Sequence, residues 1–121
     1  MILALVDDLM FRSKIKSTAR QAGVNVTFAA SQDAALTAMR ANMPALLILD
    51  LNNPRTDPLG TIAAMKKDAA LASIRTVGYA SHVDVDTIEA ARAAGVDEVL
   101  ARSAFTMKLP DIIGGATTRQ P

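Results

Sequence analysis

Five short apolar stretches recur along the chain, and helix-forming segments lie between them. The stretches cover residues 2–6, 24–28, 45–49, 75–79 and 98–100. The first and third are apolar throughout, which is typical of strands that helices cover on both faces. The second and fifth mix polar and apolar residues, as strands at a sheet edge do. The pattern therefore predicts strands that alternate with helices along one domain.

Capping residues indicate where the helices begin and end. Gly23 and Gly95 are expected to end the first and fourth helices, because glycine readily takes the left-handed conformation after a last turn. N-caps are expected at Ser31, at Asp57 before Pro58, and at Asp84 or Asp86. The residues of the third helix expected to face inward are Leu59, Ile62, Ala63 and Ala70. The last helix is expected to have Pro110 near its start, Ile112 and Ile113 as its apolar residues, and Gly114 and Gly115 at its end.

Strand–helix alternation predicts an α/β fold of the flavodoxin-like class. It is a doubly wound, five-stranded parallel sheet of order 2-1-3-4-5, with right-handed crossovers and helices on both faces. We expect the domain to cover residues 1–115, with residues 116–121 as a frayed tail. Ligands of such sheets bind beyond the carboxyl ends of the strands, at the switch point between the first and third strands.

Composition excludes several classes of function. The 121 residues include no Cys and a single His, so thiol chemistry, Cys-ligated metals and multi-His metal sites are excluded. The net charge of +1 lacks the basic excess of a nucleic-acid binder, so no direct nucleic-acid contact is expected. Two aspartates follow the first apolar stretch, and no apolar run is long enough to span a bilayer. We therefore expect a cytoplasmic protein with no membrane contact.

Carboxylates follow the two strands that flank the switch point. Asp7 and Asp8 come after the first strand, and Asp50 comes after the third. A single aspartate after a strand is most often a turn former or a helix N-cap, and that reading remains for Asp8 taken alone. Three like charges in one crevice repel each other unless a cation joins them. Oxygen ligands without His or Cys favour Mg²⁺ or Mn²⁺ over zinc.

These residues resemble the receiver domain of bacterial response regulators, of the chemotaxis-receiver type. The resemblance runs from residue 2 to about residue 113 and has four parts in order along the chain. They are Val6-Asp7-Asp8, Leu49-Asp50 with Pro54 beyond it, Ser81 after the fourth strand, and the approach to the fifth strand from Ala94 to Leu100.

The resemblance implies a role for each matching residue. Asp50 matches the phospho-acceptor. Asp8 matches the direct Mg²⁺ ligand, Asp7 a ligand that acts through water, and Asn52 the residue whose backbone carbonyl binds the metal. Ser81 matches the hydroxyl that meets the phosphoryl group. In this chemistry a carboxylate attacks a phosphoryl donor while a metal ion neutralises the oxygens.

The chain departs from the receiver pattern at two positions. Arg102-Ser103 stands where receivers carry Lys-Pro, and Arg102 is the expected phosphoryl contact despite its bulkier, fork-shaped group. Val99 stands where a switching Tyr or Phe is usual, so either phosphorylation is expected to be impaired or its read-out to differ. His82 follows Ser81 and is either an exposed loop residue or a neighbour of the phosphoryl pocket.

The leading hypothesis is a stand-alone receiver in a phosphorelay of two-component signal transduction. It is a phospho-accepting signalling domain, not an enzyme. A sensor histidine kinase or phosphotransfer protein is the expected donor, and a downstream protein or a homodimer carries the signal. The alternative is a pseudo-receiver, a phosphorylation-independent interaction module, which Arg102 and Val99 favour. The chain lacks the residues that a flavin site, a cobalamin site or a dehalogenase-like phosphatase site requires. It also contains no Gly-rich Rossmann or Walker loop.

Overall fold

The computed structural model describes residues 1–118, which alternate between strands and helices as the sequence pattern predicts. The strands are β1 (Ile2–Leu5), β2 (Val26–Ala29), β3 (Leu46–Asp50), β4 (Arg75–Ala80) and β5 (Glu98–Ala101). The helices are α1 (Leu9–Ala22), α2 (Gln32–Ala41), α3 (Pro58–Lys67), α4 (Val85–Ala94) and α5 (Arg102–Thr118), with a short 3₁₀ turn η1 (Pro54–Thr56) before α3.

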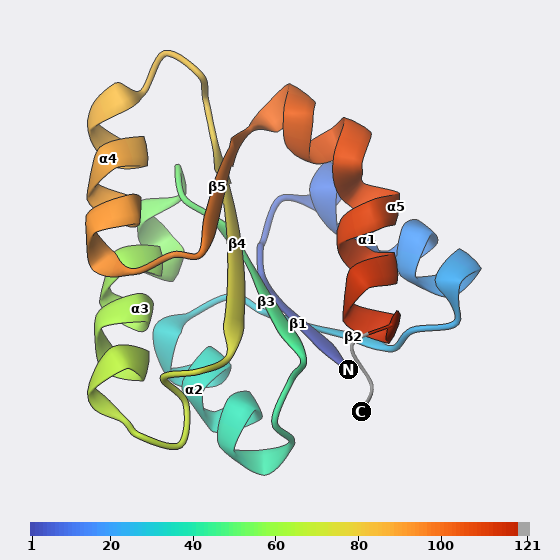
Figure 1. Cartoon of the computed structure of the whole chain (residues 1–121), viewed down its shortest axis with the longest axis horizontal. Helices are drawn as coiled ribbons and strands as arrows, with labels where there is room; N and C mark the ends of the chain where they lie inside the picture. The colour runs from blue at the N-terminus through green and yellow to red at the C-terminus, as the bar shows by residue number, and fades with distance from the viewer. Residues whose placement is uncertain (119–121) are drawn as a thin grey trace.

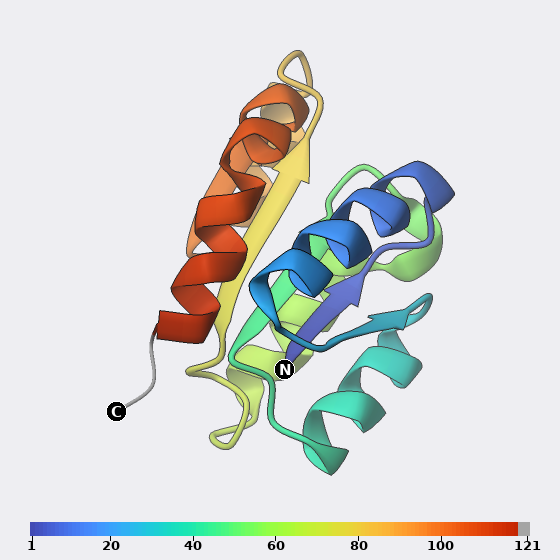
Figure 2. The same cartoon turned by 90° about the vertical axis from the view of Figure 1, so that its right-hand side faces the viewer.

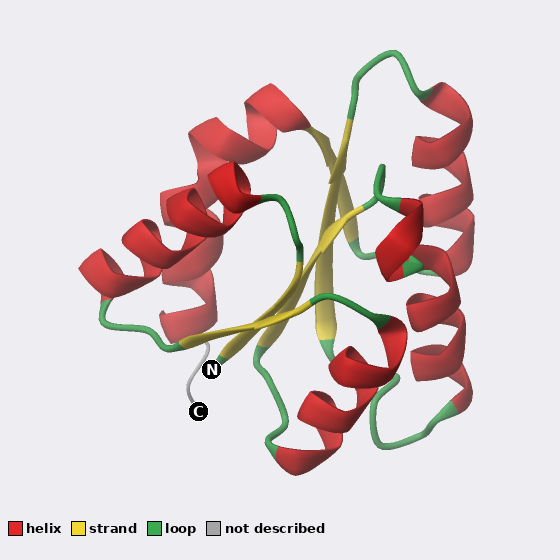
Figure 3. Ribbon diagram, turned by 180° about the vertical axis from the view of Figure 1, so that it is seen from behind, coloured by secondary structure: helices red, strands yellow, loops and turns green. Residues whose placement is uncertain are grey.

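The strands form one parallel sheet in the order β2-β1-β3-β4-β5, which confirms the predicted flavodoxin-like topology. Helices α2, α3 and α4 lie on one side of the sheet, and α1 and α5 lie on the other (Figure 1). The view from behind shows the same three layers (Figure 3). Every strand points toward the same edge, so the loops after β1, β3 and β4 gather there.

Side chains that alternate along the strands build two separate cores. In β3, Leu47 and Leu49 join the cluster under α2, α3 and α4, whereas Leu46 and Ile48 join the cluster under α1 and α5. All four are fully buried. Burial on both faces explains why this stretch is apolar throughout. It also places the side chain of the next residue, Asp50, on the α1/α5 side.

The capping predictions are confirmed at most helix ends. Gly23 and Gly95 adopt left-handed φ angles of 72° and 104° and end α1 and α4. Ser31 caps α2, Asp57 caps α3 and Asp84, not Asp86, caps α4. Two inward predictions for α3 are wrong, because Ala63 is exposed and Ala70 lies beyond the end of the helix.

The prediction for the last helix is wrong at both ends. Helix α5 begins at Arg102, contains Pro110 in its interior and continues past Gly114 and Gly115 to Thr118. An interior proline costs about 3 kcal/mol, and each interior glycine about 1 kcal/mol. The helix also buries Phe105, Leu109, Ile112 and Ile113, which are at most 5% exposed, and each is worth about 1.5–3 kcal/mol. Burial against the sheet therefore outweighs the unfavourable residues.

Helix α5 packs beside α1 over the sheet, and both begin at the edge where the strands end (Figure 2). Part of the expected tail, residues 119–121, lies outside the described residues. Within residues 1–118, no helix is both long enough and apolar enough to cross a lipid bilayer.

Candidate functional site

Asp50 is the most buried carboxylate of the strand-end edge. It is the last residue of β3, only 8% exposed, and opposite Tyr79 in the β3–β4 register. The backbone N–H of Asn52 donates a hydrogen bond to Asp50 Oδ1 at 3.0 Å. The strand thus carries an acidic group to the switch point and holds one of its oxygens in place.

Burial raises the pKa of Asp50 above its ordinary value of 3.8, because water cannot fully solvate the ionised group. The hydrogen bond from Asn52 and the charge of Arg102 act against this rise, whereas the negative charges of Asp8 and Asp7 add to it. The charges of Asp7 and Asp8 therefore repel the ionised carboxylate of Asp50, as the predicted approach of the three carboxylates implies. A cation bound among them would offset that repulsion.

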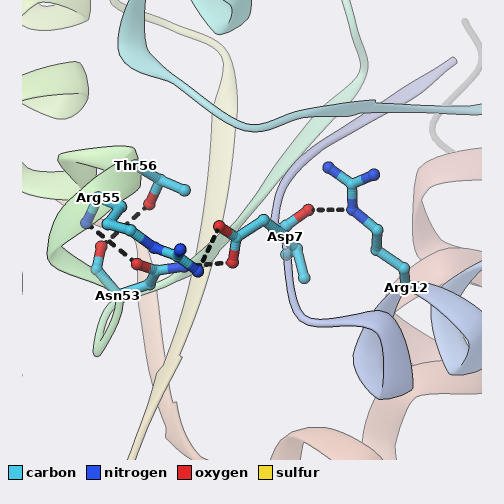
Figure 4. Close-up of polar contacts among 6 residues, drawn as sticks. Asp7, Arg12, Asn53, Arg55 and Thr56 are labelled. Carbon is cyan, nitrogen blue, oxygen red and sulfur yellow. Dashed lines mark hydrogen bonds and ion pairs between the residues drawn. The ribbon is translucent and has the colours of Figure 1, made fainter.

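The carboxylate of Asp7 points toward Asn53 and Arg55 of the loop after β3 (Figure 4). Asn53 donates a hydrogen bond from its amide nitrogen Nδ2 to Asp7, and the guanidinium of Arg55 lies 3.2 Å from Asp7 Oδ2. The side chain of Asp7 is 21% exposed and that of Arg55 is 79% exposed. An ion pair this open to water adds little stability, but its position places a positive charge at the acidic crevice.

Asp8 is exposed and acts as the N-cap of α1, with its Oδ1 accepting a hydrogen bond from the backbone N–H of Phe11 at 3.0 Å. Its second carboxylate oxygen has no hydrogen bond among the described residues. Asp8 can therefore cap α1 with one carboxylate oxygen and still offer the other to a metal ion.

The donor atoms around Asp50 suit a hard divalent cation. Within residues 1–118, no three His, Cys, Asp or Glu side chains are arranged as a ready ligand group for a metal ion. Carboxylate oxygens such as those of Asp50 and Asp8 are the kind of ligand that Mg²⁺ prefers, with water completing its coordination. The chemistry of the donors, together with the repulsion at Asp50, fits Mg²⁺.

The side chain of Asn52 bridges the far wall of the site. Its Oδ1 accepts hydrogen bonds from the backbone N–H of Ser81 at 2.6 Å and from Arg102 at 3.2 Å. Its Nδ2 donates to Asp84 Oδ2 at 2.7 Å. Hydrogen bonds from the Thr87 side chain and backbone, and from Asn52, hold the pKa of Asp84 below its usual range. Asn52 therefore joins the ends of β3, β4 and β5.

The remaining predicted site residues surround this bridge. Ser81 is half-buried after β4, and His82 beside it is exposed. Arg102 is exposed, and the ion pairs of residues 1–118 do not include one between it and Asp50. Val99 is half-buried and packs against the core under α2, α3 and α4. The structure thus brings Asp50, Asn52, Ser81 and Arg102 together.

The sequence did not predict that three further residues take part in the hydrogen bonds of the site. Asn53 and Arg55 reach Asp7 across 46 and 48 residues of chain, and no local motif indicates that contact. Asp84 was expected only as a helix cap, yet it also holds Asn52. A loop that folds back over the end of a neighbouring strand leaves no periodic signal in the sequence.

We expect Asp50→Asn to stabilise the protein in metal-free buffer at neutral pH. The pKa of Asp50 is higher in the folded protein than its ordinary value of 3.8, so the protonated side chain favours the folded state. This contribution to the free energy of unfolding is fully present below pH 3.8 and is lost as the pH rises through the folded pKa. Asparagine keeps the oxygen that accepts from Asn52 and removes the charge. The gain should be on the order of 1 kcal/mol.

Urea unfolding of both proteins across the acid range measures this effect. The stability difference should grow as the pH rises through the raised pKa and stay constant above it. Millimolar Mg²⁺ should narrow the difference by stabilising the wild type. An Asp50→Asn protein no more stable than wild type at neutral pH would contradict the repulsive crevice.

Comparisons with known proteins agree on one family. The model of the response regulator receiver domain matches residues 2–113. Three similar solved structures are a protein of Chloroflexus aurantiacus described as a response regulator, the receiver domain of NtrX from Brucella abortus, and the phosphorylated cyanobacterial phytochrome response regulator RcpA. No match was found among curated proteins.

The three structures share the fold at low sequence identity. The Chloroflexus protein has a TM-score of 0.84 at 23% identity, and the alignment covers 98% of this chain and 97% of that one. The NtrX receiver domain has a TM-score of 0.81 at 21% identity, and the alignment covers 99% of this chain and 100% of that one. RcpA has a TM-score of 0.78 at 24% identity, and the alignment covers 94% of this chain and 88% of that one.

Proposed function

The chain belongs to the response regulator receiver domain family of two-component signalling, and we propose that it accepts a phosphoryl group on Asp50. The observation that carries the proposal is the position of Asp50. It is a buried carboxylate at the end of the central strand β3, between Asp7 and Asp8 on one side and Ser81 on the other.

In the proposed reaction, an oxygen of the ionised Asp50 carboxylate attacks the phosphorus of the donor. An O–P bond forms as the bond to the leaving group breaks, and the leaving group keeps the bonding electrons. Bound Mg²⁺ supplies charge neutralisation for the phosphoryl oxygens. Its proposed ligands are Asp8, Asp50 and the carbonyl of Asn52, with Asp7 acting through water.

The other residues position the group that is transferred. The proposed role of the Ser81 hydroxyl is to meet a phosphoryl oxygen, and the hydrogen bond of 2.6 Å from the N–H of the same residue to Asn52 supports this role. Arg102 supplies positive charge from the start of α5, and its charge already favours ionised Asp50. His82 stands beside Ser81 at the rim.

The proposed donor is a phosphohistidine of a sensor kinase or phosphotransfer protein. The signal would then pass to a downstream protein through direct contact. The relative RcpA is phosphorylated in its crystal structure, which agrees with such a role.

Mass spectrometry tests the acceptor. We expect incubation with acetyl phosphate and Mg²⁺ to add one phosphoryl group to the wild type, removable by hydroxylamine, and none to Asp50→Asn. Asp57→Asn is the matched control, since Asp57 is exposed in the same loop and asparagine also caps helices. Modification elsewhere with Asp50 untouched would remove Asp50 from the mechanism.

A second candidate function is a phosphorylation-independent interaction module. The observation that favours it is the contact of Arg102 with Asn52 in place of an ion pair with Asp50 within residues 1–118. It becomes the better reading if neither acetyl phosphate nor a panel of histidine kinases modifies the wild type.

A further inference from the structure

Tyr79 lies directly beside the candidate phospho-acceptor. It is opposite Asp50 in the parallel β3–β4 register, so the two side chains leave the sheet on the same face. The residue is fully buried and belongs to the core under α1 and α5. The backbone carbonyl of Tyr79 also accepts the N–H of Leu51 at 2.9 Å, which ties β4 to the residue after Asp50.

Two aromatic rings fix the orientation of Tyr79. Phe11 of α1 and Phe105 of α5 both stack against it, with ring centroids 4.6 Å and 4.5 Å from that of Tyr79, and the two phenylalanine rings lie 6.2 Å from each other. The interplanar angles are 21° and 25°. Both phenylalanines come from the first turns of helices that begin at the strand-end edge. These ring contacts therefore restrict the orientation of the tyrosine ring next to Asp50.

The hydroxyl of Tyr79 is a buried polar group without a hydrogen-bond partner among the described residues. Buried polar groups are nearly always paired, so an orphaned one calls for a ligand or a functional reason. Burial raises the pKa of Tyr79, and the negative charges of Asp50, Asp8 and Asp7 raise it further. The phenol thus stays protonated, and it faces the electrostatic field of the acidic crevice.

The site also lacks one donor that receivers normally have. Arg102 stands at the position of the usual lysine, but its guanidinium donates to Asn52 Oδ1 at 3.2 Å. Of the two oxygens of Asp50, only Oδ1 has a hydrogen bond among residues 1–118, the one from Asn52. A protonated donor on the same face of the sheet, next to Asp50, would complete the set.

We propose that the Tyr79 hydroxyl is this donor, and that it gives a hydrogen bond to an oxygen of the acyl phosphate on Asp50. The inference rests on the proposed function and adds a phosphoryl-contacting residue that the receiver pattern does not contain. No proton is transferred, since the phenol remains intact and only orients and stabilises the modified side chain.

Tyr79 is the one tyrosine of the chain, and the chain has no tryptophan, so its emission reports on this residue alone. We expect beryllium fluoride with Mg²⁺, a stable mimic of the phosphoryl group, to change the tyrosine emission of the wild type in a saturable way. Asp50→Asn should show no such change.

Tyr79→Phe deletes the hydroxyl and keeps the stack. Calorimetric titration should show beryllium fluoride binding about tenfold weaker than in the wild type, as expected for loss of a hydrogen bond to a charged group. The unliganded variant should melt roughly 5 °C higher, because an unpartnered polar atom has been removed from the core. A residue that served packing alone would give only the second effect.

Thr76→Val is the matched control on the same strand. The Thr76 hydroxyl is fully buried at the opposite end of β4 and is paired with Asp97 at 3.1 Å. This variant should melt lower than the wild type and bind beryllium fluoride equally well. Weakening equal to that of Tyr79→Phe would overturn the inference, because removal of any β4 hydroxyl would then suffice.

The remaining outcomes separate the two proposals. If acetyl phosphate modifies Asp50 in the wild type, and Tyr79→Phe matches the wild type in beryllium fluoride affinity, only the inference about Tyr79 fails. If Asp50 of the wild type is never modified and beryllium fluoride leaves the tyrosine emission unchanged, the proposed function fails and the inference fails with it.

Discussion

Arg102→Lys is expected to accelerate phosphorylation of Asp50 by a small phosphoryl donor about tenfold, equivalent to about 1.4 kcal/mol of barrier. Arg102 is exposed, and its planar guanidinium donates a hydrogen bond to Asn52 Oδ1 at 3.2 Å, so it contacts the Asn52 side chain and forms no ion pair with Asp50 among residues 1–118. A lysine ammonium is a compact point charge on a flexible stem. It is expected to turn inward and neutralise a phosphoryl oxygen beside Asp50. Stopped-flow measurement of tyrosine emission, or timed mass spectrometry, gives the rate.

Arg102→Met separates charge from shape at this position. It keeps a long side chain and removes the positive charge, so its phosphorylation rate should fall below that of the wild type. An Arg102→Lys protein slower than the wild type would show that the contact with Asn52 is an adapted part of the site. The view of Arg102 as an impairment would then be wrong.

Phe105→Ala is expected to lower the free energy of unfolding by about 3–5 kcal/mol, the cost of truncating a fully buried aromatic ring. Phe105 is the ring of α5 that stacks on Tyr79 at 4.5 Å and lies 6.2 Å from Phe11. Its removal leaves a cavity at the base of the site. Because small domains are stable by only about 5–15 kcal/mol, urea unfolding will show the loss clearly.

Met107→Ala is the control within the same helix. Met107 is 82% exposed, two residues beyond Phe105, so its truncation should change the stability by less than about 0.5 kcal/mol. Equal losses from the two substitutions would contradict the orientation of α5 against the sheet. They would also remove the physical basis for the restricted orientation of Tyr79.

Helix α5 shows where local sequence signals mislead. Pro110 and the pair Gly114–Gly115 are strong breakers by intrinsic preference, and they predict a short helix. Burial of Phe105 and Ile113 against the sheet overrides them, because tertiary packing supplies more free energy than these residues cost. Helix propensity describes a segment in water, whereas α5 forms on an existing apolar surface.

The positions of Asp50, Asn52 and Ser81 followed from the sequence because they depend on one rule. Side chains that end parallel strands meet at one edge of the sheet, and the apolar stretches locate those ends. The sequence identified Arg102 as the expected phosphoryl contact but not its partner in the unmodified protein, because a long side chain can reach several partners that only the fold supplies. The structure places it on Asn52.

The sequence by itself determined the strand order, most of the helix caps and the set of strand-end carboxylates. These features rest on periodicity and on contacts between near neighbours in the chain, such as the 3.0 Å bond from Phe11 to Asp8. Only the tertiary structure decided that Asn53 and Arg55 contact Asp7, and that the buried hydroxyl of Tyr79, the residue opposite Asp50 in the sheet, has no hydrogen-bond partner among the described residues. Those contacts join residues about 30 to 50 positions apart. Their geometry depends on how loops and side chains pack after the sheet has formed, and no local pattern encodes it.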